Sequence, residues 1–160
     1  MKGIKEIVIF VIGGITGGLF FKRKEKEKRL SEFKTYKKFE ALYHLMNQWM
    51  SLYEMGVNVS ELLLAAGYKK IAIYGMADVG KHLYHALQGS AVEVCYGIDR
   101  GKSGQYESIE VKKPEEELAE VDAIIVTAVV DFEEIKGSLQ KKKSVPVISL
   151  EEILYEGVWR

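Results

Sequence analysis

The stretch from Lys70 to Gly80 (KIAIYGMADVG) contains residue types that can hold a phosphate group. A short apolar run ends in a glycine and a helical pattern follows at once, which is typical of a strand, a tight turn and a helix. The unpaired N–H groups at the start of such a helix carry the positive end of its dipole, so an anion can bind there without a basic side chain. The turn is therefore a candidate phosphate site.

Three positions of this turn match the spacing of the dinucleotide fingerprint GxGxxG, and they are occupied by Gly75, Ala77 and Gly80. The second position departs from the pattern, because a methyl group stands where the pyrophosphate would touch backbone. The carboxylate of Asp78 beside it also disfavours an anion. The alternative is a turn that keeps its glycines for geometry alone, with Asp78 as the helix cap.

A second strand pattern, VEVCYGID, runs from Val92 to Asp99. Asp99 follows Gly75 at about the 20-residue offset expected of an acid that binds a ribose hydroxyl, which favours NAD. Arg100 beside it would suit the 2′-phosphate of NADP, so the choice between the two cofactors stays open. The candidate ligand site comprises Gly75, Met76, Ala77, Asp78, Val79, Gly80, Asp99, Arg100, Thr127 and Ala128.

The elements that must position this site alternate between strands and helices. Strands are predicted at 71–74, 92–98, 122–128 and 145–150, with a short edge strand at 109–111. Helices are predicted at 78–88, 132–140 and 150–155, with an acidic helical turn after Pro114, a short helix capped by Ser60 and a loop at 100–108. The order predicts an α/β fold with a Rossmann-like parallel sheet of four to five strands flanked by helices.

The stretches IAIYGMADVGKHLYHAL, VEVCYGIDR, VDAIIVTAVVDFEEI and VPVISLEEILYE, in this order, resemble small NAD(P)-binding Rossmann-like domains of bacterial surface-polysaccharide loci. The resemblance covers about residues 52–156. Such domains occur fused to glycosyltransferases or alongside nucleotide-sugar enzymes. It implies a nucleotide, dinucleotide or nucleotide-sugar ligand near Gly75, Gly80 and Asp99, and a glycosyltransferase as a candidate partner.

The uncharged run from Ile7 to Phe21 predicts a membrane anchor. It would span about 22 Å as a helix, short of the ~30 Å bilayer core, so local thinning and snorkelling lysines would have to help. A cleaved signal peptide and a buried strand with a turn are the alternatives. More positive charge follows the run than precedes it, which predicts a single pass in the inner membrane with the soluble part in the cytoplasm.

Nothing breaks a helix from Lys22 to Met55, and an apolar stripe follows it at helical spacing: Phe33, Tyr36, Phe39, Leu42, Tyr43, Met46, Trp49, Met50 and Tyr53. The stripe must be covered by the α/β domain, by itself as a stalk, by a second copy or by another protein. In the anchor, Gly13, Gly14, Gly17 and Gly18 form two overlapping GxxxG patterns, a second candidate route to a homodimer. The predicted organisation is an anchor at 1–22, a basic and amphipathic stalk at 23–56 and a Rossmann-like nucleotide-binding domain at 57–160.

The net charge of zero conceals a split between the two ends of the chain. Residues 1–70 hold 13 Lys and Arg against 7 Asp and Glu, whereas residues 71–160 hold 10 against 16. The acidic globular part therefore speaks against nucleic-acid binding. The single cysteine, Cys95, falls within a predicted strand, so no disulfide can form inside one chain.

Catalytic motifs are missing from the sequence. None of the nine tyrosines is followed by a lysine four residues later, so the proton-transfer pair of short-chain dehydrogenases is missing. His82 and His85 lie on one helix face without further Cys or His ligands nearby, so no metal is expected. We expect a membrane-anchored module that binds NAD(P) or a nucleotide-sugar and serves polysaccharide biosynthesis as an accessory or regulatory subunit. The alternatives are a scaffold that binds no nucleotide and docks a membrane enzyme through its amphipathic helix, and a small oxidoreductase completed by a partner.

Overall fold

The computed structural model describes the backbone of residues 2–141 and 144–156, and the side chains from residue 23 onward within these ranges. The chain divides into two compact units, residues 1–40 and 41–160. Helix α1 (Lys2–Glu54) makes up the first unit and continues into the second. The predicted anchor at 7–21 lies outside the residues whose side chains are described. Among the residues that are fully described, no helix is long and apolar enough to cross a membrane.

In the first unit, the charged segment of α1 contains ion pairs between residues that are one helical turn apart. Arg23 Nε lies 3.0 Å from Glu27 Oε1, and Arg29 Nη2 lies 2.6 Å from Glu25 Oε1. Such exposed pairs each stabilise a helix by about 0.2–0.5 kcal/mol. They add to the long uninterrupted run of helix-forming residues that keeps this segment helical.

The second unit is built on one sheet of six strands in the order β3-β4-β2-β1-β5-β6. The strands are β1 (Lys70–Tyr74), β2 (Glu93–Ile98), β3 (Gly104–Tyr106), β4 (Ile109–Lys112), β5 (Ala123–Val126) and β6 (Val147–Ser149). All neighbours pair in parallel except β3 and β4, which are antiparallel. The α/β class is confirmed, but the sheet is mixed and has one strand more than predicted.

The additional strand β3 lies in the stretch predicted as a loop. Tyr106 pairs with Ile109 across a turn formed by Glu107 and Ser108, and Glu107 adopts a φ of +48°. Two-residue hairpin turns usually contain Asn-Gly or Asp-Gly. This turn contains Glu107 and Ser108 instead. The hairpin therefore had no signal in the sequence.

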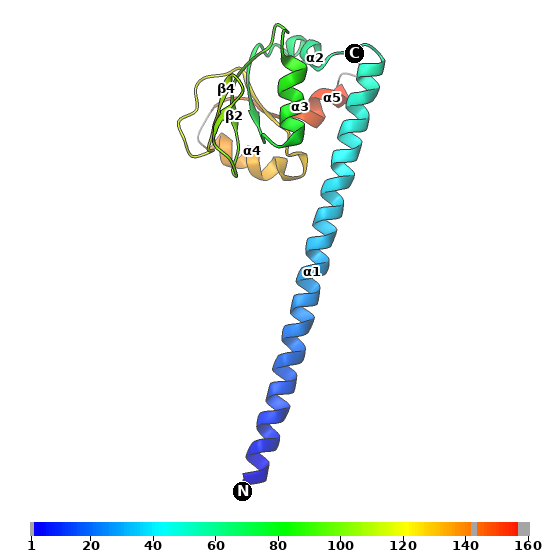
Figure 1. Cartoon of the computed structure of the whole chain (residues 1–160), viewed down its shortest axis with the longest axis vertical. Coiled ribbons are helices and arrows are strands. Elements are labelled where there is room, and N and C mark those ends of the chain that lie inside the picture. Colours follow the sequence, from blue (N-terminus) through cyan, green and yellow to red (C-terminus); the bar gives the residue numbers. More distant parts are fainter. Residues whose placement is uncertain (1, 142–143, 157–160) are drawn as a thin grey trace. The chain divides into compact units, whose positions relative to one another are not determined.

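Helices cover both faces of the sheet. They are α2 (Val59–Ala65), α3 (Asp78–Leu87), α4 (Phe132–Gln140) and α5 (Leu150–Glu156), with a 3₁₀ turn η1 at Val129–Asp131. One hydrophobic core holds side chains of α2, α3, α5 and the end of α1, and the other holds those of α4. Figure 1 shows these helices around the sheet. Ile71 and Ile73 of β1 enter the first core and Ala72 and Tyr74 the second, which explains why this strand is apolar throughout.

Two local predictions hold only in part. The residues after Pro114 form only a turn and then run irregularly to β5, held by the buried Leu118 and by the Tyr96 hydroxyl, which donates to Ala119 O at 2.7 Å. Helix α2 begins at Val59 with Asn58 as its cap residue, two positions before Ser60.

The last turns of α1 belong to the α/β unit, and they enter its core through residues outside the predicted stripe. Leu45 and Leu52 are fully buried there, whereas Tyr43 and Tyr53 are exposed. Gln48 Nε2 donates to Leu154 O of α5 at 3.3 Å. Trp49 of the stripe also packs, partly buried, against the same core.

Candidate functional site

The turn after β1 is shaped by Gly75. Its φ is +96°, and a Cβ at this position would lie 2.7 Å from Thr127 Oγ1, so both backbone and space require glycine. The Thr127 hydroxyl, at the end of β5, donates to Gly75 O at 2.7 Å. Thr127 thus holds the end of β5 against the turn after β1, with Ala128 directly beside Gly75.

The third fingerprint glycine packs the helix against the turn. A Cβ on Gly80 would collide with the carbonyl oxygen of Gly75 and would lie 3.0 Å from its carbonyl carbon. Helix α3 can approach the strand this closely because position 80 has no side chain. This is the packing role that the fingerprint gives to its third glycine.

Helix α3 begins without a side-chain cap. Ala77 occupies the cap position in an extended conformation and is exposed, and Asp78 is the first helical residue rather than the cap. The prediction that Asp78 caps this helix is therefore wrong by one position. Among the residues whose side chains are described, none accepts a hydrogen bond from the cap position or the first turn, which also contains Val79. The positive end of the helix dipole is thus not neutralised by a capping side chain.

Asp99 lies at the turn, as its position at the end of β2 predicts. Its Oδ2 accepts a hydrogen bond from Met76 N at 2.9 Å, and its Oδ1 accepts from Gly101 N at 2.7 Å and Lys102 N at 3.1 Å. A carboxylate offers about four acceptor positions. Three are used within the chain, which leaves one for a ligand hydroxyl.

Met76 contributes its side chain as well as its N–H group. The side chain is buried over Gly97 in β2, where a Cβ would lie 2.7 Å from Met76 Cγ. Gly97 was not among the predicted site residues. The signal that could have found it is a glycine inside a strand, which often marks a close approach of another group.

A cleft of about 170 Å³ lies beside this turn. Its lining comprises Met76, Lys81, Lys102, Ser103, Gly104, Gln105, Tyr106 and Val111. Lys81 comes from α3, one residue after Gly80, and its Nζ lies 5.6 Å from the centre of the Tyr106 ring. Sequence reasoning missed Lys81, Lys102 and Tyr106 because the hairpin that brings β3 to this cleft was not predicted.

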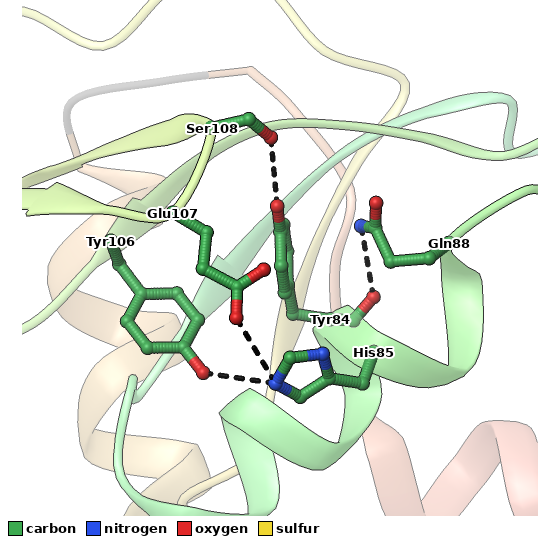
Figure 2. A network of polar contacts seen from close by, with 6 residues as sticks. All are labelled: Tyr84, His85, Gln88, Tyr106, Glu107 and Ser108. Carbon is green, nitrogen blue, oxygen red and sulfur yellow. Dashed lines mark hydrogen bonds and ion pairs between the residues drawn. The ribbon is translucent and has the colours of Figure 1, made fainter.

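A polar network holds the hairpin against α3, as Figure 2 shows. The hydroxyls of Tyr84 and Ser108 lie 2.7 Å apart, and His85 Nε2 lies 3.1 Å from the Tyr106 hydroxyl and 3.5 Å from Glu107 Oε1. Tyr84 is fully buried, whereas His85 and Glu107 are about half exposed. The network fixes Tyr106 as a wall of the cleft.

The two histidines of α3 have separate surroundings. His85 contacts Tyr106, whereas His82 borders an apolar groove lined by Met46 and Trp49. Among the residues with described side chains, no group of three metal-ligating residues occurs.

Arg100 points away from the cleft. Its Nη1 lies 3.0 Å from Glu134 Oε1 and its Nη2 lies 3.9 Å from Asp131 Oδ2, both near the start of α4. Asp131 stands at the cap position of α4, as predicted, but its side chain makes no cap hydrogen bond. The site residues named from the sequence therefore gather around the turn, except for Arg100.

Comparison with family models, with curated proteins and with solved structures found no match. The resemblance to Rossmann-like domains stays a prediction.

Hydroxyl and thiol groups of the strands are held in their neutral forms. Burial raises the pKa of Tyr96 to about 12, and burial also raises the pKa of Tyr74 and that of the Cys95 thiol. These tyrosines are therefore packing and hydrogen-bonding groups rather than bases at neutral pH.

At the opposite edge of the sheet, the backbone N–H groups of Lys70 and Lys69 donate to Asp122 and lower its pKa.

Proposed function

We propose that the unit of residues 41–160 binds a nucleotide-type ligand, NAD or a nucleotide-sugar, at the carboxyl edge of its sheet. The observation that carries this proposal is the cleft with two lysines beside the start of α3, which no side chain caps. An anion there gains the helix dipole, free backbone donors and two ammonium groups at once.

In this proposal, each part of the ligand faces a different part of the site. Phosphate oxygens would face the first turn of α3, with Lys81 and Lys102 as counter-charges. A ribose hydroxyl would donate to the one acceptor position that remains on Asp99. Because the methyl group of Ala77 is exposed beside the turn, the phosphates would lie over the helix start rather than against the second fingerprint position.

NAD fits this arrangement better than NADP. A 2′-phosphate would need the guanidinium of Arg100, which is paired with Glu134 and Asp131 instead. The ligand would have to displace two carboxylates before it gained the arginine. We therefore expect NADP to bind no more tightly than NAD.

The biological setting rests on the sequence resemblance and on the predicted anchor. In this proposal, residues 7–21 hold the chain in the inner membrane, and the nucleotide-binding unit serves surface-polysaccharide synthesis in the cytoplasm as an accessory or regulatory subunit. A glycosyltransferase is the partner that the resemblance implies. No catalytic step is assigned to this chain.

A scaffold without a nucleotide is the second candidate, and one observation favours it. Asp99 and Arg100 already have partners within the chain, so the turn is held together without a ligand. In this alternative, Asp99 serves only to stabilise the turn through its hydrogen bonds with Met76 N and Gly101 N.

A thermal-shift screen of the full chain in detergent separates the two candidates. The probes are NAD, NADP, ADP, UDP and a UDP-sugar, each at a concentration above 1 mM. A ligand at a hundred times its dissociation constant stabilises the folded state by about 2.7 kcal/mol. For a unit of this size that corresponds to a rise in melting temperature of roughly 8–10 °C. No shift with any of the five probes would favour the scaffold.

A further inference from the structure

The nucleotide site proposed above has a basic side, formed by the cleft with Lys81 and Lys102. Among the residues whose side chains are described, no carboxylate lies within 4.0 Å of either ammonium group. Lys112 differs from them, because its Nζ lies 3.6 Å from Glu110 Oε2. The two lysines of the cleft are therefore available to an anionic ligand.

The site also has an acidic side, at the start of α4. Asp131 stands at the cap position of this helix, and Glu133 and Glu134 follow in its first turn. Arg100 contacts two of these groups, with Nη1 at 3.0 Å from Glu134 Oε1 and Nη2 at 3.9 Å from Asp131 Oδ2. A phosphate on this side would meet more negative than positive charge, which costs binding energy.

The ion pairs of Arg100 lie over the end of β1. Arg100 follows β2 and Glu134 belongs to α4, which follows β5, and β1 lies between these two strands in the sheet. Burial raises the pKa of Tyr74, the last residue of β1, and the neighbouring Arg100 lowers it. A dinucleotide spans the point where the strand order reverses, which is here between β1 and β5. Its second half would have to break these ion pairs and then face the carboxylates.

The cleft is small, with a volume of about 170 Å³. Sites that hold a whole drug-sized ligand have volumes of about 300–1,000 Å³, so the cleft takes one part of a ligand. Lys81 Nζ lies 5.6 Å from the centre of the Tyr106 ring, which keeps this ammonium group at the cleft. A compact anionic group such as a diphosphate suits its size and charge.

We propose that the ligand is a nucleoside diphosphate, free or joined to a sugar, and not a dinucleotide. This inference rests on the proposed nucleotide site and names the class of its ligand. Both phosphates would lie on the basic side, near Lys81 and Lys102, and a ribose hydroxyl would donate to Asp99. The whole ligand would then stay on the β2 side of the ion pairs of Arg100.

The second fingerprint position favours the same ligand class. The pyrophosphate of a dinucleotide is held by a nucleoside at each end, so it must approach the backbone at this position closely. Ala77 places an exposed methyl group there. A terminal diphosphate is held at one end, so it can turn away from this methyl group toward the two lysines.

Calorimetric titration of the full chain in detergent tests the ligand class with UDP, UDP-glucose, ADP and NAD. We expect the tightest of the three nucleoside diphosphate probes to bind at least about tenfold more tightly than NAD. UDP-glucose binding as tightly as UDP or more tightly would assign a nucleotide-sugar, and weaker binding would assign the free diphosphate. NAD binding as tightly as the other probes would overturn this inference and leave the proposed nucleotide site intact. No binding of any probe would overturn both.

The double variant Asp131→Asn/Glu134→Gln tests the acidic side, because it removes both carboxylates that pair with Arg100. We expect the affinity for NAD to rise about fivefold and that for the tightest nucleoside diphosphate to change less than about twofold. Asp131 makes no cap hydrogen bond, so the variant should fold normally. Glu120→Gln is the control, since Glu120 is exposed and precedes β5 at the opposite edge of the sheet, and it should change neither affinity. An unchanged affinity for NAD in the double variant would contradict the proposal, and so would equal gains for both ligand classes.

Discussion

Replacing Gly80 with alanine tests the turn at its tightest point. The new methyl group would collide with the Gly75 carbonyl oxygen, which is a backbone atom held by Thr127 and cannot move aside. Overpacking of this kind costs up to about 3 kcal/mol, and the better helix propensity of alanine returns about 1 kcal/mol. We expect the free energy of unfolding to fall by about 2 kcal/mol.

Gly137→Ala is the matched control. Gly137 lies within helix α4, and a Cβ there would have no atom within 4 Å, so only the gain in helix propensity acts. Thermal unfolding of the two variants should show a fall of about 6 °C for Gly80→Ala and a rise of about 3 °C for Gly137→Ala. Two variants with the same melting temperature would refute the close packing of α3 on the turn.

Three further predictions concern the hydrogen bonds around the site and the edge opposite it. Thr127→Val keeps the side-chain shape but removes the donor to the Gly75 carbonyl, so urea denaturation should show a loss of about 1–2 kcal/mol. A double-mutant cycle with Tyr84→Phe and Ser108→Ala should give a coupling of about 1 kcal/mol, and no coupling would contradict the hairpin contact. Asp122→Asn should destabilise the protein at pH 7, because the native pKa of Asp122 is lowered by backbone donors. That difference should begin to shrink as the pH falls through about 4, where the carboxyl of the unfolded chain becomes protonated, and should be lost as the pH falls through the lower pKa of the native carboxyl. Urea midpoints at pH 7 and at about pH 3 would show the decrease.

The turn could be predicted from the sequence because the backbone conformation and the space at each position restrict which residue can stand there. Gly75 must adopt a positive φ, Gly80 must leave room for a carbonyl group, and Asp99 must follow a buried strand. Each of these requirements restricts the residue type at its own position. The α/β class could be predicted for the same reason, since strands buried on both faces are apolar throughout.

The cleft beside the turn could not be predicted, because it depends on a contact between distant segments. Lys81 and Tyr106 come together only when the β3–β4 hairpin folds onto α3, and its turn lacks the usual residues. The direction of Arg100 depends in the same way on Glu134, which lies 34 positions further on.

The amphipathic helix shows a third limit of sequence patterns. Apolar residues lie on several sides of α1 near its end, so the sequence left open whether the domain or a partner covers the stripe. Leu45 and Leu52 reach the core because the domain happens to lie on their side of the helix, which periodicity alone does not reveal.

Calorimetric titration of the full chain with the nucleotide that gives the largest thermal shift tests the proposed site most directly. The variants are Lys81→Ala and Lys102→Ala, with Lys69→Ala as the control, because Lys69 is exposed and precedes β1 at the opposite edge of the sheet. We predict that each cleft variant weakens binding by about tenfold, equivalent to about 1.4 kcal/mol, and that the control binds as the unmodified protein does. Equal affinities for all three variants would contradict a phosphate site at the start of α3.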